Sequence, residues 1–212
     1  MAVLTGAAGL AWGIAADRIA ARWPAHEDAR LRPVDWRTLV VAATGGLGFA
    51  ALGDRFGSDP PVAVFLGLLL AALVLLFATD LDQRLLPDVI TFPLAAYALA
   101  GFAAGVGPFV RTPSDLTWAA LAGIALPGIL FLVSIPFGAG AIGFGDLKLL
   151  FGVALVIGPV RTFETVLVGA IAAAVGIVIL VALRRVTLKS YVPYGPFLIA
   201  GALWAMLGPG PG

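Results

Sequence analysis

Residues 61–79 read PVAVFLGLLLAALVLLFAT, and Asp80 follows them directly. This stretch of nineteen residues holds no charged side chain, and a helix needs ~20 apolar residues to cross a bilayer. The whole chain shares this character, because 61% of its 212 residues are hydrophobic and only 12% are charged, against ~25% charged residues in soluble domains. We therefore predict an all-α, polytopic membrane helical bundle that forms a single transmembrane domain over residues 1–212.

Other apolar segments before and after this one bring the prediction to about eight transmembrane helices. The sixth segment is short, and Gly158-Pro159 separates it from the seventh. It fits either a tilted helix or one arm of a re-entrant pair. The predicted spans are residues 2–16, 38–53, 61–79, 89–109, 117–136, 149–159, 164–183 and 196–208.

The loops between eight alternating spans carry basic residues very unequally, with ten on one side and three on the other. Cytoplasmic loops are the ones enriched in Lys and Arg, so the first side is predicted to be cytoplasmic and both termini extracytoplasmic. The ten are Arg18, Arg22, Arg30, Arg32, Arg37, Arg84, Lys148, Arg184, Arg185 and Lys189, and the three are Arg55, Arg111 and Arg161.

Composition also excludes several kinds of chemistry. The net charge is only +1, which gives no reason to expect a nucleic-acid partner. The absence of cysteine excludes disulfides, thiolate metal sites and a Cys nucleophile. The single histidine, His26, lies beside Glu27 and Asp28 in a polar stretch, so a Ser-His-Asp triad is not expected. We expect no metal and no cofactor.

Acidic residues at the membrane boundary are the informative ones, because an uncompensated carboxylate there costs a few kcal/mol. A first cluster runs from Asp80 to Asp88 on the predicted cytoplasmic side. Asp80 is expected at the membrane surface or slightly within it, with a helical backbone. Asp82 is expected to face solvent or to pair with Arg84. Asp88, between Pro87 and Val89, is favoured as the N-cap of the next helix over a catalytic role.

A second acidic site lies on the same predicted side, in Gly143-Phe-Gly145-Asp146-Leu-Lys148. The glycines lack side chains and would allow an extended peptide to approach the backbone closely. Lys148 could extend to the interface. The alternative is a loop in which Asp146 only caps the following helix.

Taken together, Asp80 and Asp146 suggest a catalytic pair. Two carboxylates from separate loops at one membrane depth can share a proton. The ionised carboxylate would then remove a proton from water while the protonated one polarises a scissile carbonyl.

These residues lie in segments that resemble the prepilin peptidases, the GxGD aspartic proteases that cleave type IV prepilin leaders. Asp80 precedes Pro87 by seven residues, as the family's first catalytic aspartate does, and Gly143–Leu150 is similar to the segment with the second. Two further segments, 192–198 (VPYGPFL) and the weaker 13–24 (GIAADRIAARWP), resemble other family motifs. The resemblance implies Asp80 and Asp146 as catalytic residues, with Pro87, Gly143, Gly145 and Lys148 as supporting or substrate-binding residues.

The resemblance further implies a prepilin or pseudopilin substrate, whose basic leader stays in the cytoplasm while its apolar helix lies in the lipid. The active site would then lie at the cytoplasmic face of the inner (plasma) membrane. Many family members also carry a cytoplasmic insert with two Cys-x-x-Cys pairs and N-methylate the new terminus. This chain has no cysteine and only a short loop after its first span, so we predict an aspartic endopeptidase without predicting methyltransferase activity.

Two other functions remain open from the residues alone. The same two acids could form a proton relay in a small coupled transporter, although the internal symmetry typical of transporters is not visible. The acids could also merely cap helices in a structural membrane subunit. That hypothesis does not account for two motif-like segments on one side of the membrane.

Overall fold

The structure is a computed structural model that describes residues 1–25, 33–135, 142–183 and 194–208. The described residues form helices and connecting turns without strands, which confirms the predicted all-α class. They divide into two compact units, residues 1–108 and 109–212, and each is described by itself. The helices are α1 (Ala2–Ala20), α2 (Trp36–Phe56), α3 (Pro60–Gln83), α4 (Asp88–Thr91), α5 (Pro93–Ala103), α6 (Pro113–Ser134), α7 (Phe144–Ala182) and α8 (Gly195–Leu207).

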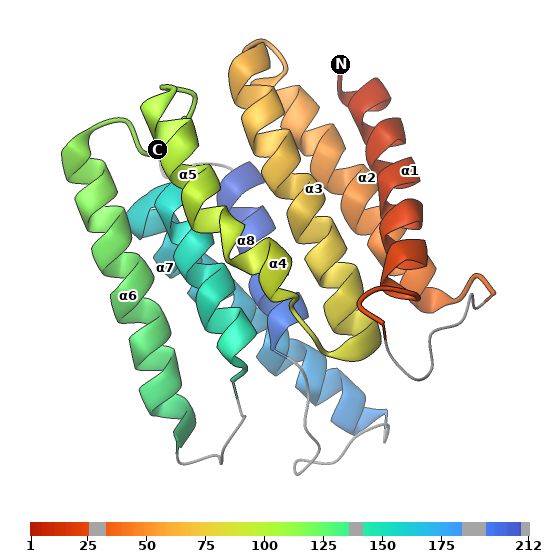
Figure 1. The fold of residues 1–212 in the computed structure, drawn as a ribbon. Coiled ribbons are helices and arrows are strands. Elements are labelled where there is room, and N and C mark those ends of the chain that lie inside the picture. The colour runs from red at the N-terminus through yellow and green to blue at the C-terminus, as the bar shows by residue number, and fades with distance from the viewer. Residues whose placement is uncertain (26–32, 136–141, 184–193, 209–212) are drawn as a thin grey trace. The chain divides into compact units, whose positions relative to one another are not determined.

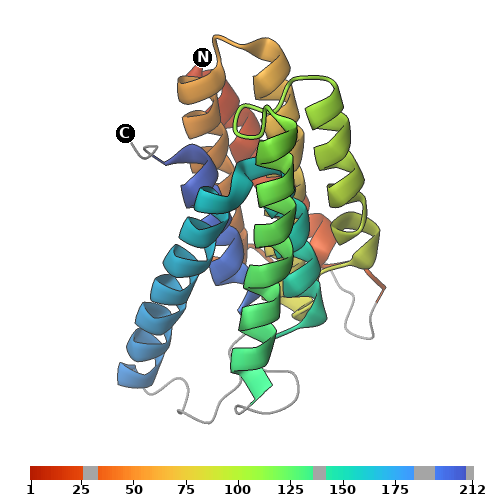
Figure 2. The ribbon, with the colours of Figure 1, turned by 90° about the vertical axis from the view of Figure 1, so that its left-hand side faces the viewer.

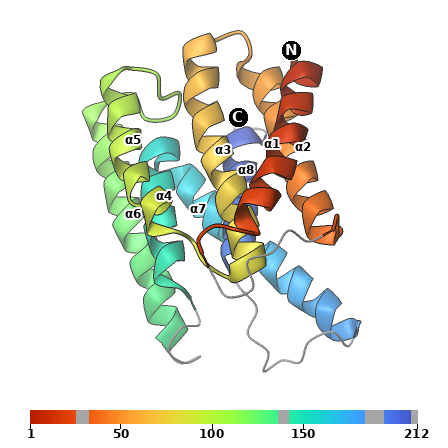
Figure 3. The same cartoon turned by 45° about the vertical axis from the view of Figure 1, so that its right-hand side comes forward.

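In the first unit, α1 and α2 pack at very short range (Figures 1 and 3). Glycines of the two helices face each other, and a Cβ built on Gly9 would collide with the carbonyl of Gly45. A Cβ on Gly13 would come within 2.5 Å of the Val41 carbonyl oxygen. Small residues allow helix backbones to approach closely, which is how helices gain packing energy inside lipid.

The third helix, α3, is the most deeply packed element of this unit and contacts both α1 and α2. Its buried side chains include Leu66, Leu70, Leu73 and Leu76. Asp59 caps its N-terminus by accepting a hydrogen bond from the Val62 N–H at 3.3 Å. The helix continues through Gln83, so the predicted span 61–79 is extended by a final turn that carries Asp80 and Asp82.

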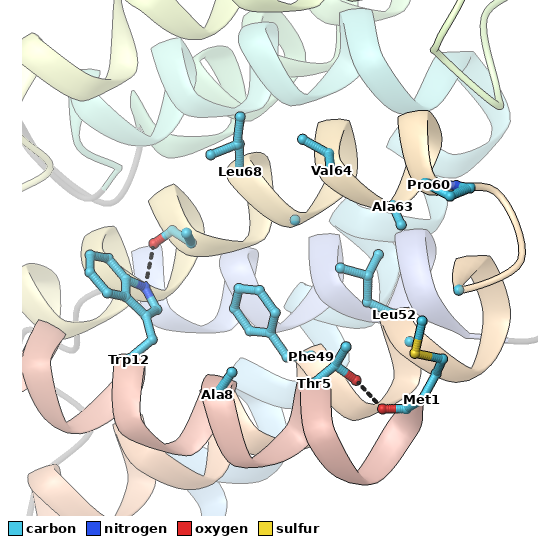
Figure 4. A pocket seen from close by; sticks show the side chains of 14 residues that line it. Met1, Thr5, Ala8, Trp12, Phe49, Leu52, Pro60, Ala63, Val64 and Leu68 are labelled. Atoms are coloured by element: carbon cyan, nitrogen blue, oxygen red, sulfur yellow. Dashed lines mark hydrogen bonds between the residues drawn. The ribbon is translucent and has the colours of Figure 1, made fainter.

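An apolar cavity of about 580 Å³ lies among α1, α2 and α3 (Figure 4). Trp12 lines it, and its indole N–H donates to the Ala71 carbonyl oxygen at 3.0 Å. This bond ties α1 to α3 near the middle of both helices.

The predicted span 89–109 is shorter than expected. The short α4 and α5 follow each other between Asp88 and Ala103, and Gly105 has a positive φ of 68° just beyond them. Tyr97 of α5 stacks on Phe65 of α3 with ring centroids 4.8 Å apart, and its hydroxyl donates to the Phe65 carbonyl oxygen. These contacts attach α5 to α3.

In the second unit, the predicted sixth and seventh spans belong to one element, α7, that is broken at Gly158. Gly158 has φ 78° and ψ 174°, a conformation that glycine adopts readily. Pro159 has no N–H to continue the hydrogen-bond ladder, and the Thr162 hydroxyl donates to the Gly158 carbonyl oxygen at 2.6 Å. Figure 2 shows the chain changing direction sharply at this break.

The two halves of α7 have different neighbours. The first half packs on α6, where a Cβ built on Gly123 would lie 3.1 Å from the Ala154 Cβ. The second half packs on α8, with Gly169 close to the Phe197 backbone. Arg161, just after the break, donates to the Ala205 carbonyl oxygen and lies 4.4 Å from the Phe109 ring centroid.

Among the residues that the structure describes, four helices are long and apolar enough to cross a membrane. They are α2, α3, α6 and α7. The segments Asp88–Ala103 and Gly195–Leu207 are apolar but shorter. The count of eight spans, the placement of the termini and the single domain therefore stay predictions.

Candidate active site

Asp80 lies in the last turn of α3, with a helical backbone as the sequence predicts. Its side chain is buried, and the residue is 5% exposed. The helix ends at Arg84, which adopts the left-handed conformation with φ 55° and donates its N–H to the Asp80 carbonyl oxygen at 2.9 Å. This well-defined end holds Asp80 one turn before the chain leaves the helix.

The expected environment of Asp82 was wrong. Its side chain is 7% exposed and forms an ion pair with Arg37 of α2, with Nη1 and Oδ1 2.8 Å apart. Arg84 is exposed, because its left-handed backbone lies beyond the end of α3. The next residue, Gln83, donates its side-chain N–H to the Ala20 carbonyl oxygen of α1 at 2.7 Å.

The prediction that Asp88 is an N-cap was wrong by one residue. Pro87 is buried and holds the N-cap position of α4 with an extended backbone, while the exposed Asp88 is the first helical residue. Pro87 thus ends the segment that follows Asp80, and Asp88 faces outward. An acid in the first turn still complements the helix dipole.

Asp146 lies in the first turn of α7 and is 7% exposed. Its Oδ2 accepts a hydrogen bond from the backbone N–H of Gly143 at 3.1 Å. Gly143 is itself the N-cap and Asp146 is the third residue of the helix, so the prediction that Asp146 could occupy the N-cap position was wrong. Asp146 still takes part in capping, because its side chain accepts the N–H of the N-cap residue. Gly145 and Lys148 are half-buried on either side of Asp146.

Tyr194 is a further polar residue near Asp146 in the second unit. It immediately precedes α8, and its hydroxyl donates to the Val166 carbonyl oxygen of α7 at 3.5 Å. Burial, followed by the negative charge of Asp146, raises the pKa of Tyr194 to about 12. The phenol therefore stays protonated at neutral pH and remains a hydrogen-bond donor.

Asp17 of α1 is a second buried acid of the first unit. It is 1% exposed, and its Oδ2 accepts a hydrogen bond from the Thr38 hydroxyl of α2 at 2.8 Å. Thr38 also belongs to a capping box with Asp35 at the start of α2.

Sequence reasoning gave no role to Asp17, Arg37, Thr38 or Tyr194. The Asp35-x-x-Thr38 pattern before an apolar run was a usable signal for a helix start. Tyr194 lies in the VPYGPFL segment, which resembles a family motif but did not predict a role for this side chain. Asp80 belongs to the first unit and Asp146 to the second, so their pairing stays a prediction.

Comparison with known proteins shows that the chain is similar to one protein family. A model described as the type IV leader peptidase family matches residues 67–181, which include both acidic segments. The chain is 34% identical over 165 residues to a prepilin leader peptidase/N-methyltransferase of Burkholderia pseudomallei, covering 77% of this chain and 52% of the relative. No solved structure matches the chain significantly.

Two relatives of the same name come from other bacteria. The Bacillus subtilis protein is 32% identical over 168 residues, covering 75% of this chain and 61% of the relative. The Pseudomonas aeruginosa protein is 29% identical over 172 residues, covering 80% of this chain and 57% of the relative. The chain thus spans just over half the length of the curated relatives it matches. With more than half of its residues matched by the family model, the chain belongs to the type IV leader peptidase family.

Proposed function

We propose that this protein is a membrane-embedded aspartic endopeptidase that removes the basic leader of type IV prepilins or pseudopilins. The observation that carries the proposal is the burial of two carboxylates, Asp80 and Asp146, at helix ends within the region matched by the family. Burying a carboxylate is costly unless it is paired or hydrogen-bonded, and buried acids are concentrated at functional sites. The family match gives no support to proton-coupled transport.

The proposed chemistry needs only the two acids and a water molecule. One carboxylate, ionised, removes a proton from the water as its oxygen attacks the scissile carbonyl carbon. The other, protonated, donates a hydrogen bond to the carbonyl oxygen as negative charge develops there. Proton transfer to the leaving nitrogen then breaks the peptide bond and restores the pair.

The proposed location is the cytoplasmic face of the inner membrane, within a bundle of about eight spans with extracytoplasmic termini. The unequal distribution of basic residues supports this orientation. The turn after α3 and the start of α7 fall on the same side of that topology. A prepilin fits such a site because its scissile bond lies where a basic leader meets an apolar helix.

The test is co-expression with an epitope-tagged prepilin, read as the shift to the mature length on a gel and as the new N-terminus by mass spectrometry. The wild-type protein is expected to shorten the prepilin, while Asp80→Asn and Asp146→Asn each leave it at full length. Asp88→Asn is the matched control, because Asp88 is exposed in the same segment as Asp80.

The peptidase function and the assignment of the catalytic pair are contradicted by different results. A full-length prepilin in wild-type membranes would overturn the peptidase function. Processing by the wild-type protein and by either the Asp80 or the Asp146 variant would overturn the assignment of the catalytic pair while leaving the function intact.

A further inference from the structure

Three polar bonds join α1, α2 and α3 to one another at the end where Asp80 lies. One bond crosses each pair of helices: α1 with α2, α2 with α3, and α3 with α1. We call this set the polar ring. Its bonds are Thr38 to Asp17 at 2.8 Å, Arg37 to Asp82 at 2.8 Å, and Gln83 to the Ala20 carbonyl at 2.7 Å.

The acidic members of the ring are shielded from solvent, whereas the side chain of Arg37 is 33% exposed. Asp17 is 1% exposed and Thr38 is 3% exposed, while the side chain of Asp82 is 7% exposed. Charge-assisted hydrogen bonds to a shielded carboxylate are stronger than those on a surface, and removing one weakens the compensation of a buried charge. The ring therefore holds the three helix ends in one arrangement.

Two members of the ring, Asp82 and Gln83, share the last turn of α3 with Asp80. One is held by α2 and the other by α1, so the turn is fixed from two directions. The direction of the Asp80 carboxylate follows from the rotation of this turn. Releasing Asp82 would let the turn rotate or unwind without removing any atom of Asp80.

We propose that Arg37 and Asp82 are positioning residues for Asp80, acting through the last turn of α3. This inference rests on the proposed peptidase function. Arg37 suits the role because its planar guanidinium forms directional bonds with a carboxylate. It is the second residue of α2, so the capped start of that helix fixes its backbone.

A positioning role differs from a purely stabilising one in what it does to kinetics. A misplaced catalytic carboxylate lowers kcat in the molecules that remain folded, whereas lost stability only lowers their number. Small misplacements cost up to about a hundredfold in rate. KM is expected to stay unchanged, because the substrate contacts are not removed.

The experiment measures kcat and KM for prepilin cleavage by the full-length protein in detergent, normalised to the folded fraction from size-exclusion chromatography. Asp82→Ala and Arg37→Ala are expected to lower kcat about tenfold or more with KM unchanged. The exchange Arg37→Asp with Asp82→Arg is expected to recover most of the loss. Asp82→Asn, which keeps the size and an acceptor oxygen, is expected to fall between wild type and Asp82→Ala.

Trp12→Phe is the matched control. It removes another bond between α1 and α3, the one from the indole to the Ala71 carbonyl oxygen, away from the turn that carries Asp80. It is expected to lower the thermal midpoint without changing kcat.

An unchanged kcat per folded molecule in Asp82→Ala would overturn the inference, as would an equal fall in Trp12→Phe. If Asp82→Ala does not fold, an unchanged kcat per folded molecule in Asp82→Asn would overturn the inference instead. The absence of cleavage by the wild-type protein would instead contradict the proposed function, so the two failures are distinguishable.

Discussion

The two proposed catalytic acids are held in opposite ways. Asp80 lies at the C-terminal end of α3, in a turn tied to α1 and α2 by side chains distant in the sequence. Asp146 lies at the N-terminal end of α7 and accepts a bond from Gly143, three residues earlier. A helix N-terminus favours a negative charge and a C-terminus opposes one, so the helix dipoles act oppositely on the two carboxylates.

This contrast predicts which changes each acid tolerates. The environment of Asp80 depends on the packing of three helices, so distant substitutions in α1 or α2 should affect it. The hydrogen bond of Asp146 to Gly143 is local, so that position should respond mainly to changes in its own turn. Four predictions test the contrast, beginning with the largest effect.

The largest effect is expected from replacing the two acids, because both are proposed to act in the same chemical step. Asp80→Asn and Asp146→Asn should each lower the cleavage rate about 10²–10⁴-fold, the usual contribution of a general acid or base. The double variant should be hardly slower than either single variant, because groups that act together are not additive. Single-turnover cleavage rates in membranes measure this.

A double variant slower by the product of the two single effects would mean that the acids act independently. Asp88→Asn serves as the control for a nearby exposed acid and should stay within about twofold of wild type, since surface substitutions have small effects.

The second effect tests the long-range support of Asp80. Gly9→Ala is expected to lower the thermal midpoint strongly and to abolish most activity, because a Cβ at Gly9 would collide with the Gly45 carbonyl. Overpacking typically costs about 1–3 kcal/mol of unfolding free energy, and more when backbone must move. Thermal unfolding followed by tryptophan fluorescence gives the midpoint.

Gly67→Ala is the matched glycine control within the same unit. A Cβ there would meet only the Leu52 Cδ2 at 3.5 Å and the Phe49 Cε1 at 3.9 Å, which is ordinary contact. Its midpoint should lie close to that of the wild-type protein. Equal destabilisation by the two variants would show that the α1–α2 approach has no special role.

The third effect tests the local support of Asp146. Gly143→Pro removes the N–H that donates to Asp146, while the φ of −73° at Gly143 suits proline. A hydrogen bond to a charged group contributes about 1.5–3 kcal/mol, so the cleavage rate should fall roughly ten- to a hundredfold. Steady-state cleavage assays measure the loss.

Gly143→Ala keeps the N–H and is the control. Its Cβ would lie 3.3 Å from the Asp146 Oδ2, a tight contact that a small shift relieves, so only a few-fold loss is expected. If Gly143→Ala were as slow as Gly143→Pro, the free space at Gly143 rather than its N–H would be what Asp146 requires.

The smallest effect concerns Tyr194. Its pKa is raised to about 12, above the ordinary value of ~10, so the folded protein keeps this phenol neutral at a pH where the unfolded chain ionises it. The free energy of unfolding should therefore fall as the pH rises from about 10 to about 12.

Absorbance of phenolate in wild type and Tyr194→Phe measures this ionisation. The phenolate absorbance of the two proteins should differ little at about pH 10, and the difference should appear only near pH 12. A full difference already at about pH 10 would show that Tyr194 is not shielded by its surroundings. At neutral pH, Tyr194→Phe should slow cleavage by no more than a few-fold.

Much of the architecture could be predicted from the sequence. Long apolar segments must satisfy their backbone polar groups internally, which favours helices in lipid, and the described residues are helical. Gly158-Pro159 marks the break in α7, because proline removes a ladder hydrogen bond and glycine permits a positive φ. The predicted span 61–79 stopped four residues before the end of α3 at Gln83, and the start of α4 differed by one residue.

The partners of the acids could not be predicted in the same way. The sequence predicted that Asp82 faces solvent or pairs with Arg84, but Arg84 lies past the helix end in a left-handed conformation and is exposed. The actual partner, Arg37, is forty-five residues away in the chain. Such a pair exists only because the start of α2 packs beside the end of α3 in the folded unit.

The sequence by itself determined the helical class, the low number of charges and the two acids that stand out at the membrane boundary. These follow from local chemistry, because apolar composition and backbone hydrogen bonding act along the chain. Only the tertiary structure decided that Asp17 and the side chain of Asp82 are shielded, and that Asp82 pairs with Arg37 in the polar ring at the end of α3. Burial and pairing between helices depend on distances that no sequence spacing encodes.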